Sequence, residues 1–277
     1  MKQLTLALTL VGALTGTLTQ PAFGGVYYEA QTTMDKGAGS STVHAWIDDQ
    51  HARVEFIESD IPMTKKGTYL ISRDGGQTLF MVNPSDETYS EWDFSAMINL
   101  AEGMSGLVNL EFSDPEVELL EEGDGGEVLG YPTRHYKYRT SYDFRMKILG
   151  MKRSNHTVTI QEMWVSQEFS DAGLNAWLRK SGRSSGDSSL DRLIGTEMEK
   201  IQGFPLKSEV VTTSVGGKKG KTQTSRSTTN VTLIRKESVK ADRFEIPSHY
   251  QRVELLPTGG EGEGDENPLG SIFGRRN

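Results

Sequence analysis

The stretch from Arg134 to Ile148, RHYKYRTSYDFRMKI, constrains the fold more than any other part of the sequence. Its side chains alternate with a period of two, and charged or polar groups hold the odd positions. The even positions are mostly aromatic or apolar, namely Tyr136, Tyr138, Thr140, Tyr142, Phe144, Met146 and Ile148. Because successive side chains of a β-strand point to opposite faces, this pattern predicts one long strand with an apolar face and a solvated face.

The cations and aromatic rings of this stretch would also suit a nucleic-acid-binding surface, provided that both kinds of side chain shared one face. The predicted strand places them on opposite faces. The chain also carries 38 acidic against 30 basic residues, for a net charge of -8, which is the wrong sign for a general binder of polyanions. We therefore predict no nucleic-acid partner.

Shorter segments with the same period recur along the chain and are separated by polar turns. They are residues 26–34, 43–47, 54–56, 69–73, 78–82, 158–165, 206–214 and 227–234. Turn residues such as Asp74-Gly75-Gly76 favour tight hairpins, and no regular helix stands between successive strands. This arrangement predicts an antiparallel sheet, in which nearly every strand has a single apolar face.

Two stretches have apolar residues at helical spacing, and they are the candidates to cover the apolar face of the sheet. The first is Phe94 to Val108, which includes Met97 and Met104, and the second is Leu190 to Ile201. The acidic residues from Ser113 to Glu127, around an Asp-Pro pair, indicate a solvated loop. The sequence therefore predicts a mainly β protein with short helices.

The first 24 residues have the features of a cleaved signal peptide. Met1-Lys2 gives a positive start, Leu4 to Leu18 is a short apolar run, and Ala22-Phe23-Gly24 fits the pattern read by signal peptidase. We predict a signal peptide at 1–24, one domain at 25–256 and a disordered acidic, glycine-rich tail at 257–277. The mature protein is then expected in the periplasm, without a transmembrane segment.

Several motifs imitate catalytic or metal sites. Gly182 to Gly186 matches G-x-S-x-G, but it lies in a polar loop instead of a strand-to-helix turn. Gly216 to Thr222 imitates a phosphate-binding loop with the wrong spacing. His44 and His51 are expected to face one carboxylate each, which is too few ligands for a metal. We predict no enzyme activity, catalytic residue, metal or cofactor.

Three short motifs, in this order, carry a resemblance to a known family. They are GYPTRHY at Gly130 to Tyr136, GFPLK at Gly203 to Lys207 and FEIPSHY at Phe244 to Tyr250. With the signal peptide and a tyrosine-containing first strand, the chain from Val26 to Val253 resembles the superfamily of bacterial periplasmic lipoprotein carriers (LolA, LolB and LppX-like proteins). It is most similar to the uncharacterised branch of exported domains of unknown function.

The resemblance implies a half-open antiparallel β-barrel wrapped around covering helices. It also implies non-catalytic binding of a lipid or other apolar ligand between sheet and helices, where methionines would give an adaptable lining. The expected ligand-binding residues are Tyr136, Tyr138, Tyr142, Phe144, Met146, Met97, Met104 and Trp164. Tyr28 and Phe80 are further candidates, and for them and Trp164 the face depends on the strand register.

Two alternatives stay open at this point. The apolar side chains could fill an ordinary core that has no cavity. The protein could also be an interaction or sensor module of the cell envelope, whose partner is another envelope protein or an anionic lipid surface. The module would use the solvated face of the long strand, with Lys137, Arg139, Arg145 and Lys147.

Overall fold

Twelve strands account for most of the chain that the structure describes, and they form one sheet. The structure is a computed structural model that describes residues 24–35, 39–48, 51–61, 64–76, 78–93, 108–148, 151–172, 192, 195–196, 203–216 and 220–254. The strand order is β12-β6-β5-β4-β3-β2-β1-β11-β10-β9-β8-β7, and only the β12–β6 pair is parallel. The strands are β1 (Gly25–Met34), β2 (Ser40–Ile47), β3 (Ala52–Ser59), β4 (Tyr69–Ser72), β5 (Thr78–Asn83), β6 (Thr88–Asp93), β7 (Val108–Val128), β8 (Tyr131–Ile148), β9 (Met151–Ser166), β10 (Phe204–Gly216), β11 (Lys221–Glu237) and β12 (Gln251–Arg252).

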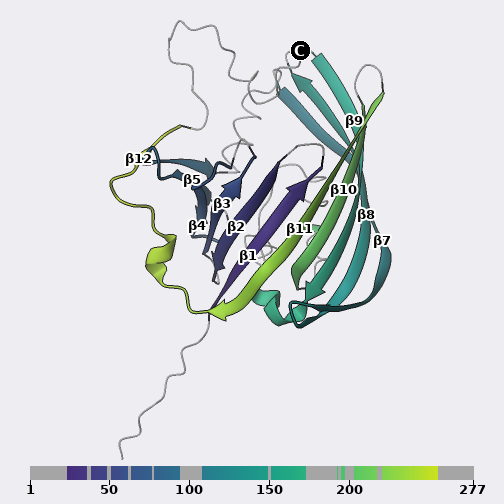
Figure 1. The fold of residues 1–277 in the computed structure, drawn as a ribbon. Coiled ribbons are helices and arrows are strands. Elements are labelled where there is room, and N and C mark those ends of the chain that lie inside the picture. Colours follow the sequence, from purple (N-terminus) through teal and green to yellow (C-terminus); the bar gives the residue numbers. More distant parts are fainter. Residues whose placement is uncertain are drawn as a thin grey trace, which may run out of the picture.

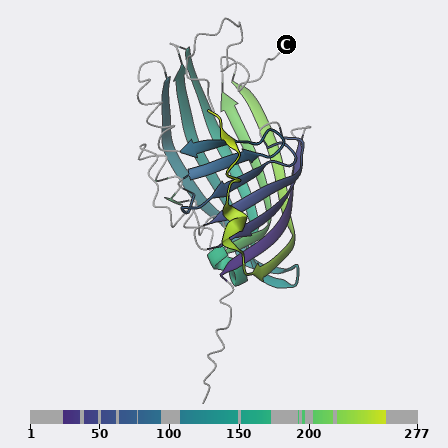
Figure 2. The same ribbon diagram turned by 90° about the vertical axis from the view of Figure 1, so that its left-hand side faces the viewer.

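The sheet curls but does not close, because β7 and β12 remain as its two edges (Figure 1). Figure 2 shows the short strands of the first half crossing in front of the long strands of the second half, so the two halves lie as two layers. The predicted mainly β, antiparallel fold is confirmed. The predicted covering helices lie outside the described residues, except Val108, which is in β7, and Arg192, Gly195 and Thr196, which are helical.

The long strand predicted from alternation is β8, and its two faces differ as expected. Tyr136 and Tyr138 are each 6% exposed, whereas Arg145 is exposed and Lys137 is half-buried. The neighbouring strand β9 pairs with β8 from Arg134 to Ile148 without a register shift. One face of this hairpin is therefore buried and the other carries the charges.

The acidic stretch that we expected to be a loop is instead part of β7, so that prediction is wrong. β7 pairs with β8 along its whole length and absorbs extra residues at three register shifts, after Ser113, Leu119 and Asp124. β7 is an edge strand, where a proline and outward charges are tolerated because one side of the backbone needs no partner. In this strand, glutamates of β7 lie opposite cations of β8, as Glu121 lies opposite Lys137 and Glu118 opposite Arg139.

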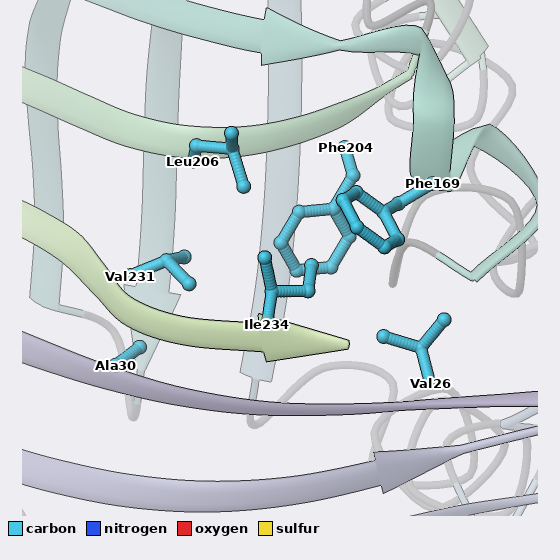
Figure 3. Packing of buried hydrophobic residues seen from close by; sticks show 7 residues of the cluster. All are labelled: Val26, Ala30, Phe169, Phe204, Leu206, Val231 and Ile234. Carbon is cyan, nitrogen blue, oxygen red and sulfur yellow. The ribbon is translucent and has the colours of Figure 1, made fainter. Parts of the chain in front are cut away.

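The buried side chains gather on both faces of the sheet. On one face, six residues of the strands pack together with Phe169 of η1 (Gln167–Ala172), as Figure 3 shows. We call this face of the sheet the inner face and this cluster the apolar floor, which consists of Val26, Ala30, Phe169, Phe204, Leu206, Val231 and Ile234.

The opposite, outer face carries a second core on the short strands, which we call the outer core. It packs against η2 (Ala241–Phe244), which lies outside the curl in Figure 1, and consists of Tyr27, Trp46, Tyr69, Ile71, Val82 and Phe244. The guanidinium groups of Arg53 and Arg73 donate hydrogen bonds to the carbonyl oxygens of Arg243 and Phe244. The expectation of a single apolar face is therefore wrong for the first half of the sheet, because the segment after β11 covers its outer face.

Candidate functional site

The inner face of the long strands is the candidate site, and Tyr136 and Tyr138 lie on it. Their rings are stacked, with centroids 6.0 Å apart and an angle of 13° between planes. They form a buried cluster with Met163 and Val165. Val165 pairs with Pro205, the residue before Leu206 of the apolar floor, so the tyrosine cluster continues the floor across the sheet.

The structure places the other predicted site residues in three groups. Tyr142 and Phe144 share the inner face and are half-buried, and the backbone of Met146 pairs with that of Arg153 on β9. Met97 and Met104 lie outside the described residues. Tyr28 is on the inner face, in contact with Phe204 at 5.1 Å between ring centroids.

Trp164 is on the outer face, so its expected grouping with the tyrosines is wrong. It pairs with His135 across β8 and β9, and the two ring centroids are 4.9 Å apart. The Lys207 ammonium lies 4.1 Å from the Trp164 ring centroid, a cation–π contact. Phe80, which pairs with Ile71, is also on the outer face. Neither residue could be assigned from sequence, since a shift of one residue in register exchanges the faces.

Lys137 and Arg139, two cations on the outer face of β8, are paired within the chain. The Lys137 ammonium lies 3.0 Å from Glu162 and 3.2 Å from Glu121. Hydrogen bonds to these two carboxylates raise the pKa of Lys137, and the Lys137 hydrogen bond lowers the pKa of Glu162. Arg139 lies 3.9 Å from Glu118. Around Lys137 and Arg139, the outer face of β8 therefore carries ion pairs and is not a bare cationic surface.

Five rows of inner-face side chains can be followed by register from β8 across β9 and β10 to β11. The fifth ends in Lys221, and sequence reasoning missed the common character of the other four. No residue of these four rows is charged. The row nearest the apolar floor consists of Tyr136, Met163, Ser208 and Thr229. The second row consists of Tyr138, Gln161, Val210 and Ser227. We call the next two rows the hydroxyl rows. The first consists of Thr140, Thr159, Thr212 and Ser225, and the second of Tyr142, Thr157, Ser214 and Gln223.

The hydroxyl rows are joined by side-chain hydrogen bonds between strands. The hydroxyls of Thr157 and Ser214 are 3.1 Å apart, and those of Thr159 and Thr212 are 3.2 Å apart. Thr157 is buried, while the other three are half-buried. The inner face thus changes along the strands from apolar, around Phe169 of η1, to uncharged and hydrogen-bonding. The serine- and threonine-rich sequence of β10 and β11 does not show this change by itself, because the face of each hydroxyl depends on the register.

Tyr27 and Tyr28, on opposite faces of β1, are expected to ionise late. Desolvation raises the pKa of Tyr28 to about 12, and desolvation with a hydrogen bond to Glu29 raises the pKa of Tyr27 to about 12, from an ordinary value of 10.0. Folding thus favours the neutral phenols, so the stability that these two groups contribute is constant below pH 10 and falls as the pH rises from about 10 to about 12, where the unfolded chain loses these protons first.

Absorbance of tyrosinate during a pH titration checks this expectation. Tyr27 and Tyr28 should ionise in a late phase, and Tyr28→Phe should remove one group from that phase. Ionisation of all tyrosines in a single phase near pH 10 in the folded protein would contradict it.

His51 lies beside one carboxylate, whereas His44 lies between two, Glu29 at 3.9 Å on β1 and Glu55 on β3. His51 Nδ1 is 2.7 Å from Asp48, and His44 pairs with Glu55 across β2 and β3. In the described ranges, no three His, Cys, Asp or Glu side chains come together as a metal site would need. Among the same residues, no helix is long and apolar enough to span a membrane.

Comparison with known proteins gives one family match. The family model described as "Domain of unknown function (DUF4412)" matches residues 23–250. A search of curated proteins finds no match. The family match agrees with the expected domain of unknown function, while export and the resemblance to lipoprotein carriers stay predictions.

Proposed function

Because the chain belongs to the family of the domain of unknown function DUF4412, we propose its function from the site itself: it binds a lipid or other apolar ligand on its inner face, without catalysis. The observation that carries this proposal is the apolar floor and its continuation to Tyr136 and Tyr138, on the inner face of an open sheet. Concave, mostly apolar surfaces are the usual sites for such ligands.

The motifs that resemble periplasmic lipoprotein carriers support the same proposal, together with the signal-peptide pattern of the first 24 residues. The protein would act in the periplasm, holding its ligand away from water. The paired charges of Lys137 and Arg139 favour this function over the envelope-module alternative, because an acidic partner would have to displace carboxylates of the same chain.

Val210 and Val211 provide a matched test. They are adjacent on β10 and both half-buried, but Val210 faces inward between Gln161 and Ser227, whereas Val211 faces outward. Arginine at position 210 would put an unpaired charge among uncharged groups. Val210→Arg is expected to weaken binding of the neutral apolar dye N-phenylnaphthylamine by about tenfold or more, and Val211→Arg by less than about twofold.

Fluorescence titration of the dye measures both affinities, with thermal unfolding as a check that each variant is folded. Ser227→Arg, on the inner face opposite Val210, is the second variant if Val210→Arg does not fold. Equal dye affinity in the inner and outer variants, or no dye binding by the unaltered protein, would overturn the proposal.

A further inference from the structure

The fold alone does not explain why hydroxyl side chains occupy the two hydroxyl rows. Valine has nearly the shape of threonine and an equal preference for strands, without the cost of removing a hydroxyl from water. Yet buried or half-buried hydroxyls recur on the inner face at Thr157, Thr159, Thr212 and Ser214. These hydroxyls lie directly beyond the apolar floor and its two neighbouring rows along the same strands.

The hydroxyl pairs keep hydrogen-bonding capacity after they bond to each other. A hydroxyl has one hydrogen to donate and two lone pairs to accept with. The single bond between Thr157 and Ser214 uses one hydrogen of the two, and so does the bond between Thr159 and Thr212. Each pair therefore retains one donor and several acceptor positions for a further polar group.

Charged side chains lie on the other face of the same strands and, on the inner face, beyond the four rows, at the paired Arg134 and Glu122 and at Lys221. Outward positions on β8 to β10 include Lys137, Glu162, Lys207 and Glu209, while these four rows are uncharged. A phosphate or ammonium group placed on the four rows would find no opposite charge there, and an unpaired charge removed from water is strongly unfavourable. A neutral polar group would pay no such cost.

We propose that the ligand is an amphiphile with a neutral, hydroxyl-bearing headgroup such as a sugar, whose apolar chain lies on the apolar floor and whose head lies on the hydroxyl rows. This inference rests on the proposed function and adds the chemistry of the head. Neutral hydroxyls of the ligand would both accept from and donate to Thr157, Thr159, Thr212 and Ser214.

Three probes that share a dodecyl chain test the headgroup. Dodecyl maltoside is neutral, dodecyl phosphate is anionic and dodecyltrimethylammonium is cationic, and each is used below its critical micelle concentration to displace N-phenylnaphthylamine. The full-length mature protein is expected to bind the maltoside about tenfold more tightly than either charged probe. If the dye does not bind at all, the proposed function fails; if the dye binds but the three probes compete equally, only the headgroup inference fails.

Matched variants locate the effect. Thr212 and Thr213 are adjacent on β10, and Thr213 faces outward, where it bonds to Thr224. Thr159→Val with Thr212→Val should remove most of the preference for the maltoside over the two charged probes, and Thr213→Val should preserve the preference. Retention of the preference in the double variant, or tighter binding of a charged probe by the unaltered protein, would overturn the inference.

Discussion

Replacing Phe244 by alanine is expected to lower the free energy of unfolding by about 3–5 kcal/mol, the range for removing a buried phenylalanine side chain. Phe244 is 2% exposed and is the contribution of η2 to the outer core. Its ring stacks on His51 at 5.2 Å between centroids. Arg53 and Arg73 anchor the backbone on either side of it, so the surroundings cannot easily collapse into the space left by the ring.

Chemical denaturation of the two proteins measures the difference. Phe244→Leu is the matched control, because it retains most of the buried volume and should cost less than about 1.5–2 kcal/mol. A loss below about 1 kcal/mol for Phe244→Ala would mean that the segment after β11 is not part of the core.

Gly203→Ala is expected to cost roughly 3 kcal/mol or more, because two penalties combine there. Gly203 has a φ of 125°, a conformation that side chains with a Cβ rarely adopt. An added Cβ would lie 2.6 Å from the Ser166 carbonyl oxygen and 2.7 Å from Val165 Cγ1. Backbone and a fully buried valine cannot move aside cheaply, so the entry into β10 and the adjoining end of β9 would both be disturbed.

Gly220→Ala is the control, since Gly220 also has a positive φ, 56°, but nothing lies within 4 Å of the added Cβ. It should cost only about 1 kcal/mol. Thermal and chemical unfolding of the two variants give the comparison. Equal costs at the two positions would show that the close approach at Gly203 has no energetic consequence.

The sequence predicted the strands well where a single strand carries enough alternation. The period of two at Arg134 to Ile148 gave β8 and the burial of Tyr136 and Tyr138, because it depends only on local geometry. The hairpin between β4 and β5 was predicted for the same reason, and Asp74 holds its turn by accepting a hydrogen bond from the Thr78 backbone.

What could not be predicted depends on contacts between distant segments. The face of Trp164 could not be assigned because neighbouring positions on β9 are both apolar, and only the pairing with β8 decides between them. The strand β7 was missed because its glutamates are explained only by the cations of β8. The outer core requires η2, more than 150 residues away from most of its partners, which no local pattern shows.

The hydroxyl rows illustrate the same limit within the candidate site. Threonine is common in strands whichever face its side chain occupies, so the abundance of threonine and serine in β10 and β11 predicts no site. The rows appear only when Thr159 is placed beside Thr212 by pairing of β9 with β10. A property of the inner face thus emerges from register and not from composition.

Mass spectrometry of an organic extract is the most direct test of ligand binding on the inner face. The mature protein would be purified without detergent from the periplasm of a bacterial host, checked for folding, extracted and compared with Val210→Arg prepared in parallel. We predict near-stoichiometric amphiphile in the extract of the unaltered protein and far less from the variant. An empty extract from folded, unaltered protein would contradict the proposal that this sheet carries a lipid.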